Sequence, residues 1–136
     1  MHAADKVLYV QRPYDQILRV IKEVPEQCLV LTYARLCLDF DGFIDRVSRF
    51  TGVPVTKPMW EQLECERTEN LWENRKWSAT AYGRGGDVMP GRYKHELRPE
   101  TIKVLSKEFE PYLRKMAEYE PDYAHLYLEG LQEEEL

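Results

Sequence analysis

The stretch Cys28-Leu29-Val30-Leu31-Thr32-Tyr33 decides the fold that we expect. It is a nearly continuous apolar run of strand length, which is typical of a strand in a sheet covered on both faces. A shorter run with β-branched and aromatic members, Val7 to Val10, precedes it. With a helix between the two runs, the usual right-handed crossover makes the strands parallel.

The segment between these runs has the spacing of an amphipathic helix. Pro13 can occupy a first helical turn, and Pro25 should stop the helix. The apolar face would carry Tyr14, Ile17, Leu18, Ile21 and Val24. The resulting β-α-β unit is too small to be a complete sheet, so a further partner for its open edges is expected.

The clearest helix of the chain follows the second run. Asp39 or Asp41 can cap its start, and Gly52 with Pro54 should end it. A shorter helical turn is expected from Pro58. The apolar stripe of the clear helix consists of Phe40, Phe43, Ile44, Val47 and Phe50.

The C-terminal part also shows helical spacing. Residues 68–90 mix aromatic residues with glycines and are expected to be mainly loop. A long amphipathic helix should begin at Pro99, and Pro111 should kink it or begin a second segment. Its apolar positions are Ile102, Leu105, Phe109, Leu113 and Met116, and Tyr123, Leu126 and Tyr127 can add a last turn. The expected class is α/β, mostly helical.

Size and charge limit the function. The 136 residues suit one domain, expected over residues 1–131, with an acidic tail at 132–136. The net charge is −5, from 24 acidic and 19 basic side chains, and it should repel nucleic acid and anionic lipid. We therefore expect no nucleic-acid or membrane partner. A small anion remains a plausible ligand, since one Arg and a few backbone N–H groups can bind it.

Cysteine usage and hydropathy indicate the compartment. Cys28, Cys37 and Cys65 form no CxxC pair, and two of them lie in apolar runs where reduced thiols pack well. No apolar stretch approaches the roughly 20 residues that span a bilayer, and the start has no hydrophobic signal region. These features predict a cytoplasmic protein.

Three stretches of the chain form a recognisable set. The first is Arg84-Gly85-Gly86 with Gly91-Arg92-Tyr93-Lys94-His95-Glu96-Leu97 and Pro99-Glu100-Thr101. The second is Leu29 to Leu36 followed by Arg49-Phe50-Thr51-Gly52-Val53-Pro54, and the third is Lys6 to Asp15. Together they resemble the C-terminal part of the sulfotransferase family, which transfers a sulfuryl group from 3′-phosphoadenosine 5′-phosphosulfate.

Each stretch is similar to one part of that family. The first resembles its late Arg-x-Gly loop, its Gly-x-Trp/Tyr-Lys segment and the helix that follows. The second resembles a strand ending in Tyr-Glu-Asp-Leu, with Ala34 and Arg35 at the acidic positions. The third resembles the strand and the Arg-x-Pro-x-Asp turn that begin the 3′-phosphate site. The resemblance implies a partial P-loop-type sulfotransferase fold.

The resemblance also implies a ligand and its site. The nucleotide would be 3′-phosphoadenosine 5′-phosphosulfate or its product adenosine 3′,5′-bisphosphate, bound by Arg84, Gly85, Gly86 and Arg12. The acceptor would be a hydroxyl or an amine. The family's phosphosulfate-binding loop has no counterpart here, because neither G-x-x-x-x-G-K-[ST] nor Lys-Ser/Thr-Gly-Thr occurs. No catalytic base can be assigned, so the isolated chain should be incomplete or inactive.

The candidate residues also have ordinary structural interpretations. An Arg-Gly-Gly sequence is in most proteins a surface turn, and Arg12 can be a solvated charge. His95 is a candidate base on its proximity to Arg84 in sequence alone. The histidines lack the spacing of metal ligands, so no metal is expected. The aromatic residues Trp60, Trp72, Trp77, Tyr82 and Tyr93 can line a pocket or simply pack.

Two classes of function follow. The chain can be a sulfotransferase-like protein, either a truncated or split protein that completes its site with another polypeptide or a very compact relative of the family. It can instead be a non-catalytic helical interaction module derived from that scaffold. A homodimer or another subunit could cover the open edges and apolar face in either case.

Overall fold

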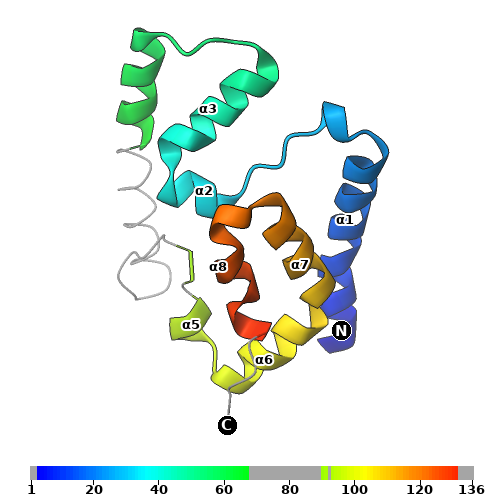
Figure 1. The fold of residues 1–136 in the computed structure, drawn as a ribbon. Helices are drawn as coiled ribbons and strands as arrows, with labels where there is room; N and C mark the ends of the chain where they lie inside the picture. Colours follow the sequence, from blue (N-terminus) through cyan, green and yellow to red (C-terminus); the bar gives the residue numbers. More distant parts are fainter. Residues whose placement is uncertain (1–2, 68–89, 92, 132–136) are drawn as a thin grey trace. The chain divides into compact units, whose positions relative to one another are not determined.

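The computed structural model describes residues 3–67, 90–91 and 93–131 (Figure 1). The chain divides into two compact units. The first unit comprises Met1–Thr32 and Tyr93–Leu136, and the second comprises Tyr33–Arg92. Every regular element in the described ranges is an α-helix or a 3₁₀-helix. The expectation of a mostly helical protein is therefore confirmed, and the expected parallel β-α-β unit is wrong.

The first expected strand is part of helix α1, Ala3–Glu23. Val7 and Val10 continue the three- and four-residue spacing of Tyr14, Ile17 and Ile21, so one helical period accounts for all five. A short apolar run cannot be assigned to strand or helix from its own periodicity. Pro13 lies inside this helix rather than at its start, at the cost of one backbone hydrogen bond.

The second expected strand does not form. After a 3₁₀ turn at Pro25–Gln27 (η1), Cys28 has extended dihedrals of φ −119° and ψ 135°. Residues 28–32 form no strand, and helix α2, Tyr33–Leu38, begins directly after them. Because residues 7–10 are helical, they do not provide the neighbouring strand with which we expected this segment to form a sheet.

Helix α3, Phe40–Thr51, of the second unit confirms the expected caps. The side chain of Asp39 accepts a hydrogen bond from the Gly42 backbone N–H at 3.1 Å. A Cβ atom on Gly42 would collide with that carboxylate, so the cap favours glycine here. Gly52 ends the helix with a left-handed φ of 72°. Residues 57–67 are helical, as expected from Pro58.

The C-terminal part of the first unit is a run of short helices. Its elements are α5 (Tyr93–Glu96), α6 (Pro99–Glu108), α7 (Glu110–Tyr119), η2 (Pro121–Tyr123), α8 (Ala124–Leu128) and η3 (Glu129–Leu131). The expected break near Pro111 is confirmed, since α6 gives way to α7 at Phe109. Helix α7 packs against α8, and α6 packs against η3. The expected acidic tail at 132–136 lies outside the described residues.

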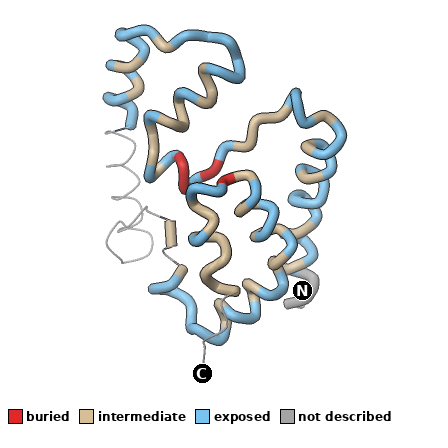
Figure 2. Tube along the Cα trace, in the orientation of Figure 1, coloured by how far each residue is buried: buried red, intermediate tan, exposed pale blue. Residues whose placement is uncertain are grey.

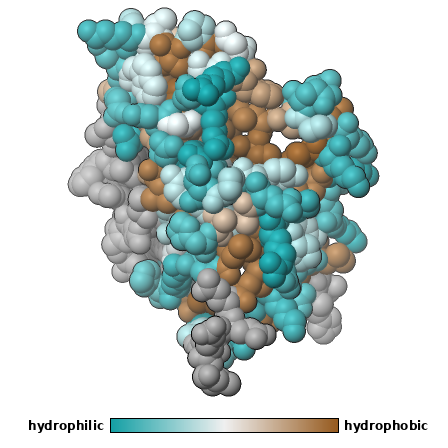
Figure 3. Space-filling model, in the orientation of Figure 1, coloured by the Kyte–Doolittle hydropathy of each residue, from teal (hydrophilic) through white to brown (hydrophobic). Residues whose placement is uncertain are grey.

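Burial is shallow throughout the described residues (Figure 2). Among the hydrophobic residues that the structure describes, Ala34 alone is buried, with 4% of its surface exposed. Apolar side chains therefore reach the surface in several places (Figure 3). The large hydrophobic residues that are exposed include Leu8, Tyr9, Val10, Tyr14, Ile17, Val20, Leu31, Tyr33, Leu36, Leu38, Phe50, Val53, Met59, Leu97 and Val104.

Candidate functional site

The predicted ligands of the nucleotide are placed as follows. Arg84, Gly85 and Gly86 lie outside the described residues. Arg12 is exposed within helix α1, so it does not follow a strand and does not stand in an Arg-x-Pro turn. The local context that the resemblance implied for Arg12 is therefore wrong, whereas its role as a ligand remains a prediction.

The segment that follows the predicted loop in sequence contains a left-handed glycine and a helical turn. Gly91 has a φ of 97°, a left-handed conformation that a residue with a side chain rarely adopts. Helix α5 then makes one turn, in which the Leu97 backbone N–H donates to the Tyr93 carbonyl at 2.8 Å. Pro99 opens α6 at the position where proline costs no backbone hydrogen bond.

A carboxylate from the far end of the chain holds this segment in place. The hydroxyl of Tyr93 donates to Glu129 Oε1 at 2.7 Å, and Lys94 Nζ lies 2.8 Å from the same oxygen. The three side chains form what we call the Glu129 cluster. Since Tyr93 and Lys94 belong to α5 and Glu129 to η3, the cluster ties together two ends of the C-terminal helical run.

The Glu129 cluster positions helix α5 and offers no catalytic base. Burial, and then the hydrogen bond to Glu129, raise the pKa of Tyr93 to about 12. The phenol therefore stays protonated at neutral pH and can donate a hydrogen bond but cannot act as a base. The carboxylate of Glu129 compensates the charge of Lys94, which weakens the attraction of Lys94 for an anionic ligand.

A second carboxylate lies at the end of α7 and is fully buried. Glu120 has 0% of its surface exposed, and Thr32 has 3%. Thr32 Oγ1 donates to Glu120 Oε2 at 3.0 Å, across 88 residues of sequence. Burial raises the pKa of Tyr127, and the charge of Glu120 adds to this, while a hydrogen bond with Thr32 acts in the opposite direction. We call these three residues the Glu120 cluster.

The Glu120 cluster explains how the extended segment is held. A buried carboxylate is costly unless donors satisfy its oxygens, so Thr32 and Glu120 depend on one another. Their hydrogen bond fixes the end of residues 28–32 to the turn between α7 and η2. The segment that we expected to be a strand is therefore ordered by a side chain instead of by a sheet.

In the second unit, the two positions that are acidic in the family have a different role. Ala34 and Arg35 are both buried in α2. Arg35 Nη1 lies 2.8 Å from Asp39 Oδ2, four residues later. The hydrogen bond from Arg35, and then that from the Gly42 backbone, lower the pKa of Asp39. Arg35 thus supports the N-terminal cap of α3.

Of the remaining candidates, the structure describes His95 and Trp60. His95 is exposed on α5. Trp60 packs edge-on against Phe40 with ring centroids 6.4 Å apart, which favours the packing interpretation for this residue. Trp72, Trp77 and Tyr82 lie outside the described residues.

Sequence reasoning missed both Glu129 and Glu120. Two adjacent donors, Tyr93 and Lys94, indicate that an acceptor is needed, but nothing in their spacing indicates which of the many glutamates supplies it. Thr32 within an apolar run was a comparable signal, since a buried hydroxyl needs a partner.

The described residues show neither a metal-binding group nor a membrane-spanning helix. Within the described ranges, no three His, Cys, Asp or Glu side chains are placed to hold a metal ion together. The same residues contain no helix that is both long and apolar enough to span a bilayer. Comparisons with models of known protein families, with curated proteins and with solved structures find no match to this chain.

Proposed function

We propose that this chain is a sulfotransferase-like protein that binds the nucleotide end of 3′-phosphoadenosine 5′-phosphosulfate. Arg84 supplies charge-assisted hydrogen bonds to a phosphate, and Gly85 and Gly86 let backbone N–H groups approach it. A second polypeptide supplies the missing phosphosulfate-binding loop and the base for transfer to a hydroxyl or amine. Alone, the chain binds the nucleotide and does not transfer the sulfuryl group.

One observation carries the proposal. In the stretch that resembles the family's Gly-x-Trp/Tyr-Lys segment, Gly91 has a left-handed φ, and helix α5 precedes the start of α6 at Pro99. The resemblance implies a helix after this segment. The Glu129 cluster anchors the segment that follows the predicted loop in sequence, and a segment that is already held in place loses less entropy when a ligand binds.

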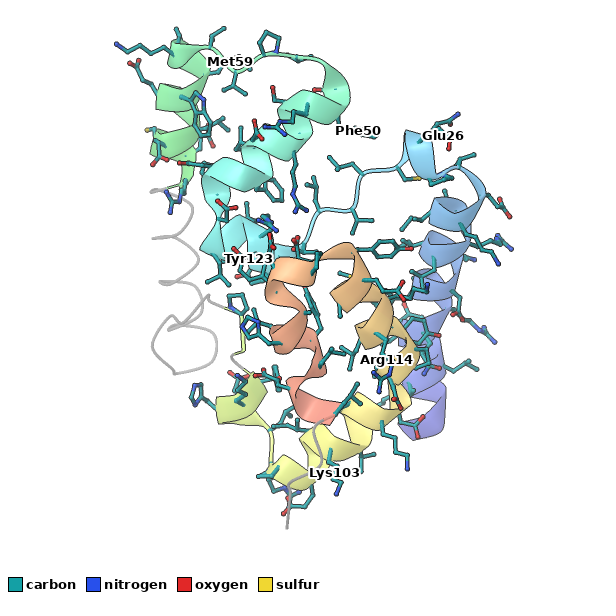
Figure 4. All side chains as sticks on the ribbon, viewed as in Figure 1. Glu26, Phe50, Met59, Lys103, Arg114 and Tyr123 are labelled. Atoms are coloured by element: carbon teal, nitrogen blue, oxygen red, sulfur yellow. The ribbon has the colours of Figure 1, made fainter. Side chains whose placement is uncertain are left out.

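Titration calorimetry with adenosine 3′,5′-bisphosphate tests the proposal. The wild-type chain should bind with a micromolar dissociation constant, and Arg84→Ala should weaken binding by about tenfold or more, since a hydrogen bond to a charged group contributes about 1.5–3 kcal/mol. Arg114→Ala is a matched control, because it removes the same charge from the exposed face of α7, where Arg114 pairs with Glu110 (Figure 4).

The possible outcomes separate the parts of the proposal. A folded wild-type chain that gives no binding heat would contradict it. Equal losses in Arg84→Ala and Arg114→Ala would indicate a general charge effect rather than a site. Arg12→Ala, titrated in the same way, decides whether Arg12 is a second ligand despite its position within α1.

The second candidate function is a non-catalytic interaction module. It is favoured by the exposed hydrophobic side chains, since soluble monomers seldom leave large contiguous apolar patches in water. A chain that ignores the bisphosphate but associates with itself or with another protein would support this function over the first.

A further inference from the structure

Helix α1 combines an attached side and an apolar exposed side. On the attached side, Gln11 Nε2 donates to the Glu108 carbonyl at 3.0 Å, and the Tyr112 hydroxyl donates to Asp15 Oδ1 at 2.7 Å. The rings of Tyr14 and Tyr112 lie 5.9 Å apart. These contacts join α1 to the α6–α7 part of the same unit.

The exposed side of α1 is a continuous apolar stripe. Tyr9, Val10, Ile17 and Val20 are 74%, 45%, 53% and 46% exposed. Together with the exposed Pro13 they recur three, four or seven residues apart, so they share one face of the helix. This apolar stripe is distinct from the attached side, because Gln11 and Asp15 lie on the other side of the helix.

A polar row borders the apolar stripe and indicates what covers it. Arg12, Gln16, Arg19 and Glu23 are all exposed and recur at four, three and four residues. In a symmetric antiparallel pair of α1 helices, the same edge of each copy meets the other with its order reversed. Arg12 then lies opposite Glu23 of the second copy, and Gln16 lies opposite Arg19.

We propose that a second copy of this chain covers the apolar stripe, with two α1 helices packed antiparallel about a two-fold axis near Ile17. The reversed order gives two Arg12–Glu23 ion pairs across the axis. In a two-fold parallel pair the polar row of each copy would instead face the opposite edge of the other stripe, near Tyr14 and Ile21, so Arg12 would not meet Glu23. The charge pattern thus selects the antiparallel arrangement. The proposal does not depend on nucleotide binding by Arg84, although Arg12 is also a predicted nucleotide ligand.

The expected affinity is modest. One helix face per copy buries an area near or below the ~1,000 Å² that a lasting interface needs. Self-association should therefore be in the micromolar range and should weaken as salt screens the ion pairs. Sedimentation equilibrium of the full chain over on the order of 10–500 µM should show a monomer–dimer equilibrium.

Two variants test the apolar stripe and the polar row separately. Ile17→Asp places a charge in the centre of the stripe and should raise the dissociation constant about tenfold or more. Arg12→Glu should raise it about three- to tenfold, because two attractive pairs become repulsive. The double variant Arg12→Glu with Glu23→Arg restores opposite charges and should return the constant to within about threefold of the wild type.

Controls keep these outcomes decisive. Lys103→Glu makes the same charge change on the exposed face of α6 and should leave the dissociation constant unchanged (Figure 4). Circular dichroism of each variant checks that the helices persist. A wild-type chain that stays monomeric throughout, or a dimer indifferent to Ile17→Asp, overturns the proposal. A double variant no better than Arg12→Glu overturns the antiparallel arrangement.

Discussion

Helix α1 and the C-terminal run of helices belong to the same unit, yet they are held by different kinds of contact. The C-terminal run is fixed by two carboxylates, one fully buried at Glu120 and one half-buried at Glu129, each with donors from distant parts of the sequence. Helix α1 is attached through exposed hydrogen bonds of Gln11 and Asp15. Exposed polar contacts contribute little, because water competes for the same groups.

This contrast indicates where the chain depends on itself and where it is available to a partner. Both carboxylates of the C-terminal run accept hydrogen bonds from donors within the unit, so this run should resist opening. Helix α1 leaves much of its apolar surface in water and should open more easily. Variants at Glu120, Glu129 and Tyr112 test this difference.

Removal of the buried Glu120 carboxylate should lower the free energy of unfolding more than any other change. Glu120→Ala leaves a cavity and removes the carboxylate that accepts from the Thr32 hydroxyl, so the free energy of unfolding should fall by about 3 kcal/mol. Thr32→Val, which removes only the hydroxyl, should cost about 1–2 kcal/mol. Chemical denaturation of both variants and of the double variant gives their coupling energy. Independent, additive losses would contradict the hydrogen bond as the link between residues 28–32 and α7.

The helices of this chain could be predicted from sequence better than its tertiary contacts. Caps and prolines act locally, which is why Asp39, Gly52 and Pro111 correctly mark the bounds of α3 and the break before α7. The expected strands failed for a non-local reason. A strand at residues 28–33 needed residues 7–10 as a neighbouring strand. Residues 7–10 are helical instead, because Val7, Val10 and Tyr14 follow the helical period of α1.

In the candidate site, too, local structure could be predicted from the sequence and the tertiary contacts could not. Gly91, Tyr93 and Pro99 form the turn and helix start that a local pattern can encode. Their acceptor, Glu129, lies 36 residues away from Tyr93, and no spacing rule identifies it. Glu120 was equally hidden, because a glutamate beside Pro121 has the sequence features of a solvated loop, and only the tertiary fold buries it.

The Glu129 cluster should give an intermediate effect with a distinctive pH dependence. Glu129→Gln keeps the size of the side chain but removes its charge, so it should lower the free energy of unfolding by about 1 kcal/mol. The pKa of Tyr93, about 12 in the wild type, should fall towards its ordinary value of 10. Tyrosine-ring NMR titration, assigned with Tyr93→Phe, measures this change.

The sign of the stability effect follows from the raised pKa. The folded state favours the protonated phenol, so the stabilisation is fully present below pH 10 and is lost as the pH rises from 10 towards 12. Tyr93→Phe should remove this alkaline loss. A Tyr93 pKa that is the same in wild type and Glu129→Gln would show that burial alone raises it, and that the cluster contributes nothing to the anchoring of α5.

The attachment of α1 should give the smallest effect on global stability and the clearest local one. The hydrogen bond to Asp15 raises the pKa of Tyr112, so the contact engages the protonated phenol and the carboxylate. Because this contact is exposed, Tyr112→Phe should cost only about 0.5 kcal/mol and keep the ring packed against Tyr14. Amide hydrogen exchange, measured where the chain is monomeric, should speed up about two- to threefold in α1.

The same experiment contains its own control. Amides of α7 and α8 should exchange at wild-type rates in Tyr112→Phe, because the Glu120 cluster holds them independently of α1. Equal acceleration in all three helices would mean that the unit opens as a whole, and the contrast between the two regions would not hold. Acceleration confined to α1 would show that this helix opens on its own, as a surface helix available to a second copy of the chain should.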